Sequence, residues 1–323
     1  MVNEFTPDTE ISLSFENQRA VVSPWGASLR RYFVIDASGG ETDILWGYSG
    51  GGSKKGGQGD VLIPFPGRVA EGRYLFDGRV LQLDRNDKEG PNAIHGFVRS
   101  LPWSMQPADS NRATFDVRLD AGTYGRRGYP FTLDVGVTYL LDHRGLCCSF
   151  EVRNAGHEAA PVGAGFHPYF TVGTALVDQA EAKIPGAGIV AFNERLLPTG
   201  TILSAAGSEW DYRDYRLIGH RRFNHCYTRL ERDPDGLATA ALRDVKSGRL
   251  VEVVMDRSFF AVVVYTGDAI ADAPRRAVAI EPMTCATDSF NHPEWGLKRL
   301  VPGETFSGRY WVRHRREPGL PQK

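Results

Sequence analysis

Hydrophobic and polar residues alternate along much of the chain, in short segments that are separated by turns rich in glycine and proline. Residues 115–119 show this alternation, and residues 133–139 and 146–152 repeat it on either side of a turn. Successive side chains of a strand point to opposite faces, so a period of two predicts half-buried antiparallel strands. The last two segments should form a hairpin, with Cys147 and Cys148 on opposite faces.

The same pattern recurs in the rest of the chain. Asp77-Gly78 supplies the positive φ angles of a tight turn, so residues 74–83 should form a second hairpin. The basic run 313–316 should be a solvated tail. Further strands are expected at residues 250–255, 259–265, 277–280 and 306–312.

The pattern also bounds the fold class. No stretch of about 12 residues carries the hydrophobic stripe of a helix, which argues against βαβ units and a dinucleotide-binding fold. The chain has 323 residues, with no internal repeat and no polar linker between two halves. We therefore predict an all-β protein, a sandwich or a similar fold, with residues 1–323 forming a single domain.

Charge and composition argue against several classes of partner. Lys and Arg number 38 against 39 Asp and Glu, so the net charge of −1 would attract neither nucleic acid nor an anionic membrane. Neither a long apolar stretch nor an apolar leader follows the N-terminus, which predicts a soluble, unprocessed chain. The four cysteines form no C-x-x-C pair, so neither zinc nor a disulfide framework is expected, and a reducing cytoplasm fits best.

Residues 47–59 are unusually rich in glycine and include Lys54 and Lys55. They are expected to form a mobile surface loop. A phosphate-binding loop would need G-x-x-x-x-G-K-[ST] followed by a helix, and the sequence offers neither. Residues 47–51 match the G-x-S-x-G pattern of serine hydrolases around Ser49. The glycines that follow cannot begin the helix of a nucleophile elbow, so a simple turn is preferred.

Three segments place chemically active side chains in apolar, turn-rich surroundings instead of on a charged face. In the first, Arg68 follows an apolar run, and His95 lies between Ile94 and Gly96. A partly buried guanidinium needs an acceptor, and a structural ion pair would satisfy that need. His95 could be a hydrogen-bonded core residue, but the glycine behind it would also let a ligand approach closely.

The other two segments contain a histidine and a carboxylate. His167 and Tyr169 are the titratable groups of the apolar segment 163–170, where the charge of a histidine can be tuned across neutral pH. Glu281 ends the apolar strand 277–280, and a carboxylate there is costly unless it is paired or functional. Pro282 should stop this strand. Each of these side chains, taken alone, is as compatible with a structural role as with catalysis.

Together, the three segments supply one carboxylate, two imidazoles and one arginine. They supply no metal quartet, no nucleotide loop and no activated serine or cysteine, which leaves acid/base chemistry without a cofactor or a metal. Aromatic side chains such as Tyr169 suit the apolar faces of a sugar ring, and Arg68 and Asn92 suit its hydroxyls. A small-molecule sugar is therefore the expected substrate.

At these residues the sequence resembles the aldose 1-epimerases, also called galactose mutarotases, from about residue 11 to about residue 313. The motifs appear in the family's order: Pro66-Gly67-Arg68, His95-Gly96, the His-x-Tyr-Phe element at 167–170, and Glu281-Pro282. The resemblance implies one large antiparallel β-sandwich, the galactose mutarotase-like supersandwich, with a sugar site on its concave face. It also implies interconversion of the α and β anomers of a sugar.

The resemblance further implies a role for each site residue. Glu281 would be the base at the anomeric hydroxyl, and His167 would be the acid at the ring oxygen. His95 and Arg68 would bind the sugar and the charge that develops on it, and Arg68 would help to keep Glu281 ionised.

One departure from the family concerns substrate choice. The family commonly has a sugar-binding aspartate where this chain has Asn224, which can accept and donate hydrogen bonds but has no charge. The substrate would be either a neutral hexose or an anionic one, such as a hexose phosphate or sulfonate, that Arg221 or Arg222 could help to bind. A non-catalytic sugar-binding protein is a third interpretation, against which the presence of both Glu281 and His167 argues. The sequence leaves the oligomeric state open.

Overall fold

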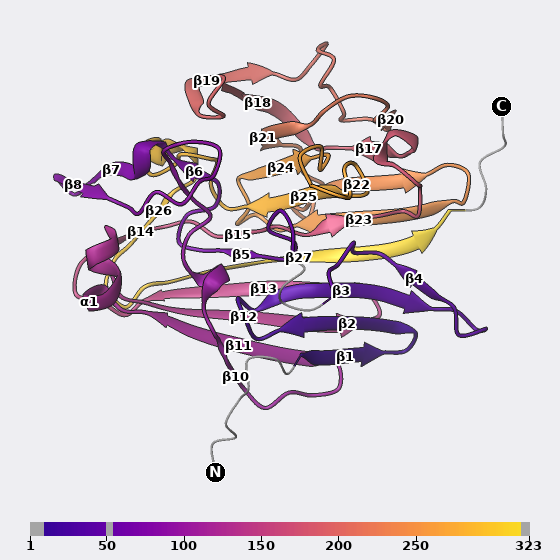
Figure 1. The fold of residues 1–323 in the computed structure, drawn as a ribbon, viewed down its shortest axis with the longest axis horizontal. Helices are drawn as coiled ribbons and strands as arrows, with labels where there is room; N and C mark the ends of the chain where they lie inside the picture. Colours follow the sequence, from indigo (N-terminus) through magenta and orange to yellow (C-terminus); the bar gives the residue numbers. More distant parts are fainter. Residues whose placement is uncertain (1–9, 50–53, 318–323) are drawn as a thin grey trace.

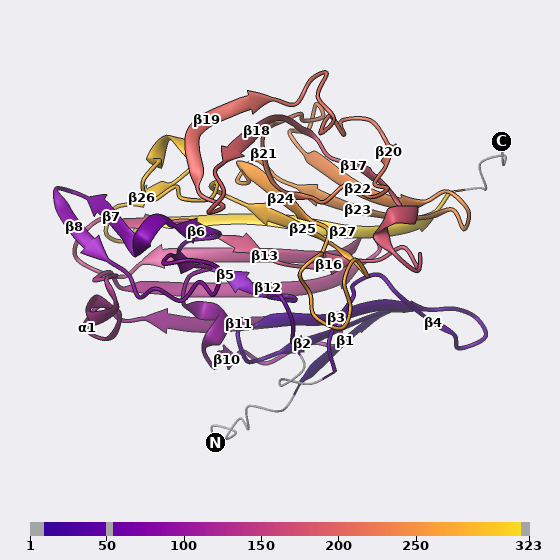
Figure 2. The same ribbon diagram turned by 45° about the horizontal axis from the view of Figure 1, so that its top comes forward.

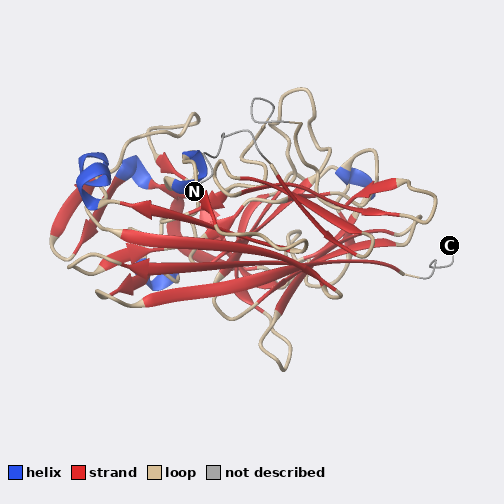
Figure 3. Ribbon diagram, turned by 90° about the horizontal axis from the view of Figure 1, so that it is seen from below, coloured by secondary structure: helices blue, strands red, loops and turns tan. Residues whose placement is uncertain are grey.

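The computed structural model describes residues 10–49 and 54–317, and their regular structure is almost entirely β-strand (Figures 1 and 3). The one α-helix in these ranges is α1 (Ala121–Tyr124), a single turn capped by the side chain of Asp120. No helix of the described chain is long and apolar enough to cross a membrane. Short 3₁₀ segments are η2 (Ala70–Gly72), η3 (Val98–Ser100), η4 (Gly125–Arg127), η5 (Val177–Gln179) and η6 (Pro293–Trp295). The prediction of an all-β fold is confirmed.

The largest sheet has nine antiparallel strands. In sheet order they are β10 (Ser104–Met105), β11 (Arg112–Leu119), β12 (Leu133–Asp142), β13 (Gly145–Asn154), β27 (Thr305–Arg316), β23 (Arg249–Met255), β22 (Ala238–Asp244), β17 (Glu181–Lys183) and β20 (Arg216–Leu217). The expected hairpin joins β12 and β13 and places Cys148 opposite Tyr139. Cys148 enters the main core, whereas Cys147 packs in a small cluster with Val254 and Trp311.

A second sheet, of eight strands, faces part of the first (Figure 2). Its strands are β19 (Pro198–Ser204), β18 (Gly186–Phe192), β21 (Asn224–Leu230), β24 (Ala261–Tyr265), β25 (Val278–Met283), β15 (Gly165–Phe166) and β5 (Val61–Leu62), and β16 (Tyr169–Phe170) also pairs with β25.

Smaller sheets complete the architecture. A four-stranded sheet packs against β11 and β12, and it consists of β1 (Ile11–Phe15), β2 (Gln18–Ser23), β3 (Ser28–Ile35) and β4 (Glu41–Asp43). Three strand pairs are β14 (Ala160–Val162) with β26 (Lys298–Leu300), β6 (Arg68–Val69) with β9 (Ala93–Ile94), and β7 (Arg73–Phe76) with β8 (Arg79–Gln82). The turn between β7 and β8 has the expected positive φ angles at Asp77 and Gly78.

The main hydrophobic core lies between the sheets. Every second residue of β12 is buried along the whole strand, which is the alternation that its sequence predicts. Ile280 and Val264 enter this core from the eight-stranded sheet. The ring of Phe166 contacts both Phe150 and Tyr310, so aromatic side chains tie the two large sheets together.

The prediction that Pro282 stops its strand is wrong, because β25 continues to Met283 and Pro282 pairs with Val262. The N–H of Ile280 donates to the carbonyl of Pro168, on the side of β16. Backbone N–H groups alternate along a strand, so the nitrogen of Pro282 points to that same side and away from β24, and the ladder with β24 loses no hydrogen bond. The strand therefore tolerates a residue without an N–H there.

Two further expectations need correction. The basic run 313–316 is not a tail but the last part of β27, where His314 lies opposite Val251 of β23. Within the glycine-rich segment, residues 50–53 lie outside the described residues, and with them part of the G-x-S-x-G match and of the phosphate-loop comparison. Gln58 and Gly59 are buried rather than on the surface, and the Gln58 amide donates to the carbonyls of Trp46 and Gly47.

Candidate active site around Glu281 and His167

Glu281 lies on β25, on the face of the eight-stranded sheet that is turned away from the main core. Ile280 enters that core, whereas Glu281 lies opposite Val263, which belongs to a second, smaller apolar cluster. Only 3% of Glu281 is exposed. Burial raises the pKa of Glu281 well above its ordinary value, and the positive charge of Arg68 opposes this shift. The carboxyl therefore holds a proton more tightly than an exposed glutamate does.

His167 occupies the break between β15 and β16. Its backbone N–H donates to the carbonyl of Asp60 at 3.0 Å, and its carbonyl accepts from the N–H of Gly59 at 3.0 Å. These two bonds fix the residue so that Nε2 of its ring lies 3.5 Å from Oε1 of Glu281. The structure thus brings together the two residues that the family resemblance names as base and acid.

Burial sets the protonation of this pair. It acts together with the positive charges of Arg99 and Lys54 to lower the pKa of His167 to about 3. Burial thus favours the neutral acid form of the Glu281 carboxyl and the neutral base form of the His167 imidazole. In the sugar-free protein the pair therefore favours a proton on Glu281 and a neutral His167.

His95 faces His167 from the loop after β9. The ring centroids are 5.4 Å apart and the ring planes meet at 82°. The N–H of Gly67 donates to Nδ1 of His95 at 3.2 Å, which leaves Nε2 to carry the hydrogen of the neutral ring. A Cβ on Gly96 would lie 2.1 Å from the carbonyl oxygen of Ile63, so close backbone packing, and not ligand access, requires that glycine.

Two carboxylates that the sequence analysis did not identify hold Arg68. Its Nε donates to Asp87 at 2.8 Å and its Nη2 donates to Glu89 at 2.6 Å. Asn92 is fully buried, donates to the same Asp87 carboxylate at 3.0 Å and accepts from the N–H of Glu71. The acceptor that a buried guanidinium needs is therefore present, and Asn92 supports Arg68 through Asp87. The one available signal was the charged run at residues 84–89.

Tyr169 supports His167 from β16. The two rings stack at 5.1 Å with an angle of 20° between their planes. The phenolic hydroxyl donates to the carbonyl of Gly56 at 2.9 Å, and the side chain is buried. Tyr169 thus links the imidazole to the glycine-rich segment.

Asn224 begins β21 and is exposed on the same face of the sheet as Glu281. It lies opposite Tyr265 on β24, and Cys226, two residues further on, lies opposite Val263, which in turn lies opposite Glu281. Side chains two residues apart on a strand share a face. The structure therefore places Asn224 where its side chain and that of Glu281 border the same region.

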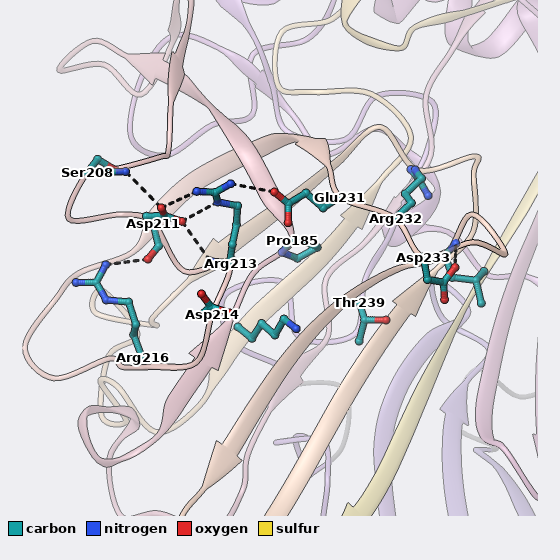
Figure 4. Close-up of a pocket in the computed structure, with 13 residues that line it drawn as sticks. Pro185, Ser208, Asp211, Arg213, Asp214, Arg216, Glu231, Arg232, Asp233 and Thr239 are labelled. Atoms are coloured by element: carbon teal, nitrogen blue, oxygen red, sulfur yellow. Dashed lines mark hydrogen bonds and ion pairs between the residues drawn. The ribbon is translucent and has the colours of Figure 1, made fainter.

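A separate polar pocket of about 780 Å³ lies beside β17, β20 and β22 (Figure 4). None of the predicted site residues lines it. Arg213 donates to Asp211 at 2.8 Å and to Glu231 at 3.0 Å, and Arg216 donates to the carbonyl of Asp211. Asp211, Arg213 and Glu231 are thus paired with one another in this pocket.

Comparison with known proteins agrees with this arrangement. The family model described as aldose 1-epimerase matches residues 9–313. The chain belongs to the aldose 1-epimerase family. Two relatives are a galactose mutarotase of Mus musculus, 27% identical over 318 residues (90% of this chain, 89% of that protein), and the uncharacterized protein YihR of Escherichia coli, 29% identical over 234 residues (72% and 71%).

Solved structures show that the fold is also that of the aldose 1-epimerases. An aldose epimerase homologue from Caenorhabditis elegans superposes with a TM-score of 0.84 at 17% identity, over 96% of this chain and 99% of that one. The predicted galactose mutarotase-like sandwich is therefore confirmed.

Proposed function

We propose that the protein is an aldose 1-epimerase that interconverts the α and β anomers of a hexose by acid/base-catalysed ring opening and closure, without a cofactor. The observation that carries the proposal is the buried pair of Glu281 and His167, whose carboxyl and imidazole lie 3.5 Å apart. A sugar-binding module needs hydrogen bonds and stacking surfaces. It does not need a carboxyl and an imidazole whose uncharged forms are both favoured by burial.

Ring opening moves two protons at two neighbouring oxygens. The anomeric hydroxyl loses a proton to the base, the ring oxygen gains a proton from the acid, and the bond between C1 and the ring oxygen breaks to give an aldehyde. Both oxygens are bonded to C1, so acid and base must lie close together, as Glu281 and His167 do. After rotation about the C1–C2 bond, the reverse transfers close the ring on the other carbonyl face and restore both groups.

We assign Glu281 as the base and His167 as the acid. This direction requires the proton of the pair to lie on His167 when the sugar is bound. Arg68 favours that state, because its positive charge stabilises an ionised Glu281. His95, with its hydrogen on Nε2, would donate to the oxygen on which negative charge develops.

Substrate choice depends on the region that Asn224 borders. The side chain of Arg222 is 83% exposed, and its ion-pair contact with Asp268 is long at 3.6 Å. Its guanidinium can therefore turn toward a charged group of a sugar. Arg221 contacts Tyr212, whose ring packs against Phe223. It is therefore the weaker candidate. A neutral hexose remains our first proposal, and an anionic hexose is the alternative that Asn224 and Arg222 support.

The test is exchange NMR spectroscopy of the wild-type protein with glucose, galactose, glucose 6-phosphate and a sulfonated hexose. Exchange between α and β signals above the buffer rate for any of them supports the proposal, and the preferred sugar decides between the neutral and anionic alternatives. Binding of a sugar without faster exchange would identify a sugar-binding protein and contradict the proposal.

A further inference from the structure

Three charged side chains form a cluster beside His167, partly within the glycine-rich segment. Asp60 is 4% exposed, and its carboxylate makes an ion pair with Lys54 and lies 3.3 Å from Nη1 of Arg99. Lys54 and Arg99 are themselves mostly buried. A buried carboxylate between two cations is costly to assemble unless the charges serve one another or a neighbouring group.

The backbone connects this cluster directly to the imidazole. The carbonyl of Asp60 accepts the N–H of His167. A Cβ on Gly57 would lie 3.2 Å from Cδ2 of His167 and 3.3 Å from Oδ2 of Asp60, so ring and carboxylate are no further apart than the sum of these distances. The glycine leaves room for both groups to approach the same point.

The charges around the imidazole come from several elements. Lys54 and Arg99 oppose a positive charge on His167, and Asp60 pairs with both and offsets one of their two charges. Without Asp60, two unbalanced cations would face the ring. The titratable and charged groups beside His167 are Glu281 on β25, His95 after β9, Tyr169 on β16, Arg99 on η3, Lys54 in the glycine-rich segment and Asp60 directly after it.

We propose that Asp60 is a positioning residue for the reaction: its carboxylate offsets one of the two positive charges of Lys54 and Arg99, and so lets His167 carry the proton that the ring oxygen of the sugar receives. This inference rests on the proposed function. Lys54 of the glycine-rich segment and Asp60, which directly follows that segment, would then support the reaction through His167.

Charge-balanced variants test this role. Asp60→Asn should lower kcat for the best hexose about tenfold with little change in KM, because His167 loses its protonated form and not its place. Asp60→Asn combined with Lys54→Met removes one charge of each sign and should restore most of kcat. If the second substitution restored stability but not kcat, Asp60 would be a residue that only stabilises the fold.

Lys54→Met alone gives a readout that does not depend on turnover. In the sugar-free protein it should raise the pH midpoint of the His167 imidazole by about one unit, as NMR titration of ¹³C-labelled histidine would show. Asp211→Asn, which breaks the ion pair with Arg213 in the distant polar pocket, is the matched control and should change neither kcat nor the midpoint.

The proposal is overturned if the double variant is no more active than Asp60→Asn, or if Lys54→Met leaves the His167 midpoint where it is in the wild type. If Asp60→Asn does not fold, the Lys54→Met titration decides alone. If the wild type turns over no sugar, the proposed function fails, and the titration still reports whether the cluster controls the charge of His167.

Discussion

The site around Glu281 and the polar pocket around Arg213 shift the pKa values of their ionisable groups in opposite directions. In the pocket, hydrogen bonds from Arg213 lower the pKa of Asp211, and the same bonds raise the pKa of Arg213. On β25, burial raises the pKa of Glu281, and the imidazole of His167 lies 3.5 Å from its carboxyl. One region fixes its charges, and the other keeps its groups close to neutrality.

This difference separates a structural ion-pair network from a site for proton transfer. A carboxylate that a guanidinium holds stays ionised at neutral pH and has little tendency to take up a proton. The buried Glu281 carboxyl beside an imidazole can gain or lose one, because burial favours its neutral form and the charge of Arg68 favours its ionised form. The pocket of Figure 4 is an evident hollow, yet the chemistry points to the pair on β25.

The largest effect is expected from removing the base. Glu281→Gln keeps the shape of the side chain but not its basicity, so anomer exchange should fall by about 10² or more. Glu231→Gln in the polar pocket is the matched control and should leave the rate within a factor of about two. Exchange NMR measures both variants. Near wild-type turnover in Glu281→Gln would show that the assignment of the base is wrong.

The two histidines should differ in kind. His167→Asn removes the acid and should lower kcat by about 10², whereas His95→Asn removes a hydrogen bond to the sugar and should impair both kcat and KM. Steady-state kinetics at several sugar concentrations separates the two patterns. Small effects on KM alone in both variants would instead indicate a binding protein.

Stability should reveal the buried carboxyl independently of activity. Because the folded-state pKa of Glu281 is raised, its proton is lost more readily from the unfolded chain, and stability falls as pH rises above about 4.5 toward the folded pKa. Glu281→Gln lacks this term, so its stability relative to wild type should increase between pH 5 and 8, by about 1.4 kcal/mol per unit of the shift.

Urea unfolding at several pH values measures this difference. Asp211→Asn provides the contrast: the pKa of Asp211 is lowered, so its stabilising contribution is present at neutral pH and is lost only on acidification. This variant should be slightly less stable than wild type, by an amount that does not change between pH 5 and 8. If the stability difference between Glu281→Gln and wild type also stayed constant between pH 5 and 8, the pKa of Glu281 would not be raised in the folded protein.

The smallest effect concerns specificity. A charged acceptor strengthens a hydroxyl hydrogen bond by about 1 kcal/mol over a neutral one, so Asn224→Asp should improve kcat/KM for neutral hexoses about fivefold. It should worsen kcat/KM for a phosphorylated or sulfonated sugar, which the new carboxylate would repel. Parallel kinetics with glucose and glucose 6-phosphate checks the sign. Harm to both substrates would remove the main support for an anionic substrate.

The strands could be predicted because burial on one side leaves a period of two in the sequence, most clearly along β12. The motifs around Arg68, His95, His167 and Glu281 were visible because functional side chains stand out in apolar surroundings. What could not be predicted depends on the side to which a backbone group points. Pro282 leaves the ladder with β24 intact because its nitrogen points away from β24.

The supporting residues were not predictable for a related reason. Asp87, Glu89 and Asp60 look like ordinary surface carboxylates in the sequence, and only the meeting of separate loops shows what they hold. Glycine-rich segments are usually read as mobile, but Gly57 is needed for the close approach of the Asp60 carboxylate to His167. Such long-range pairings leave no periodic signal.

The most direct test of the pair is a double-variant cycle of Glu281→Gln and His167→Asn, measured as anomer exchange with the preferred hexose. Two groups that pass protons through one transition state act as a unit, so the double variant should be about as slow as the slower single variant. Losses that multiply, so that the double variant falls by the product of the two single effects, would show that the residues act independently and would contradict the acid/base pair.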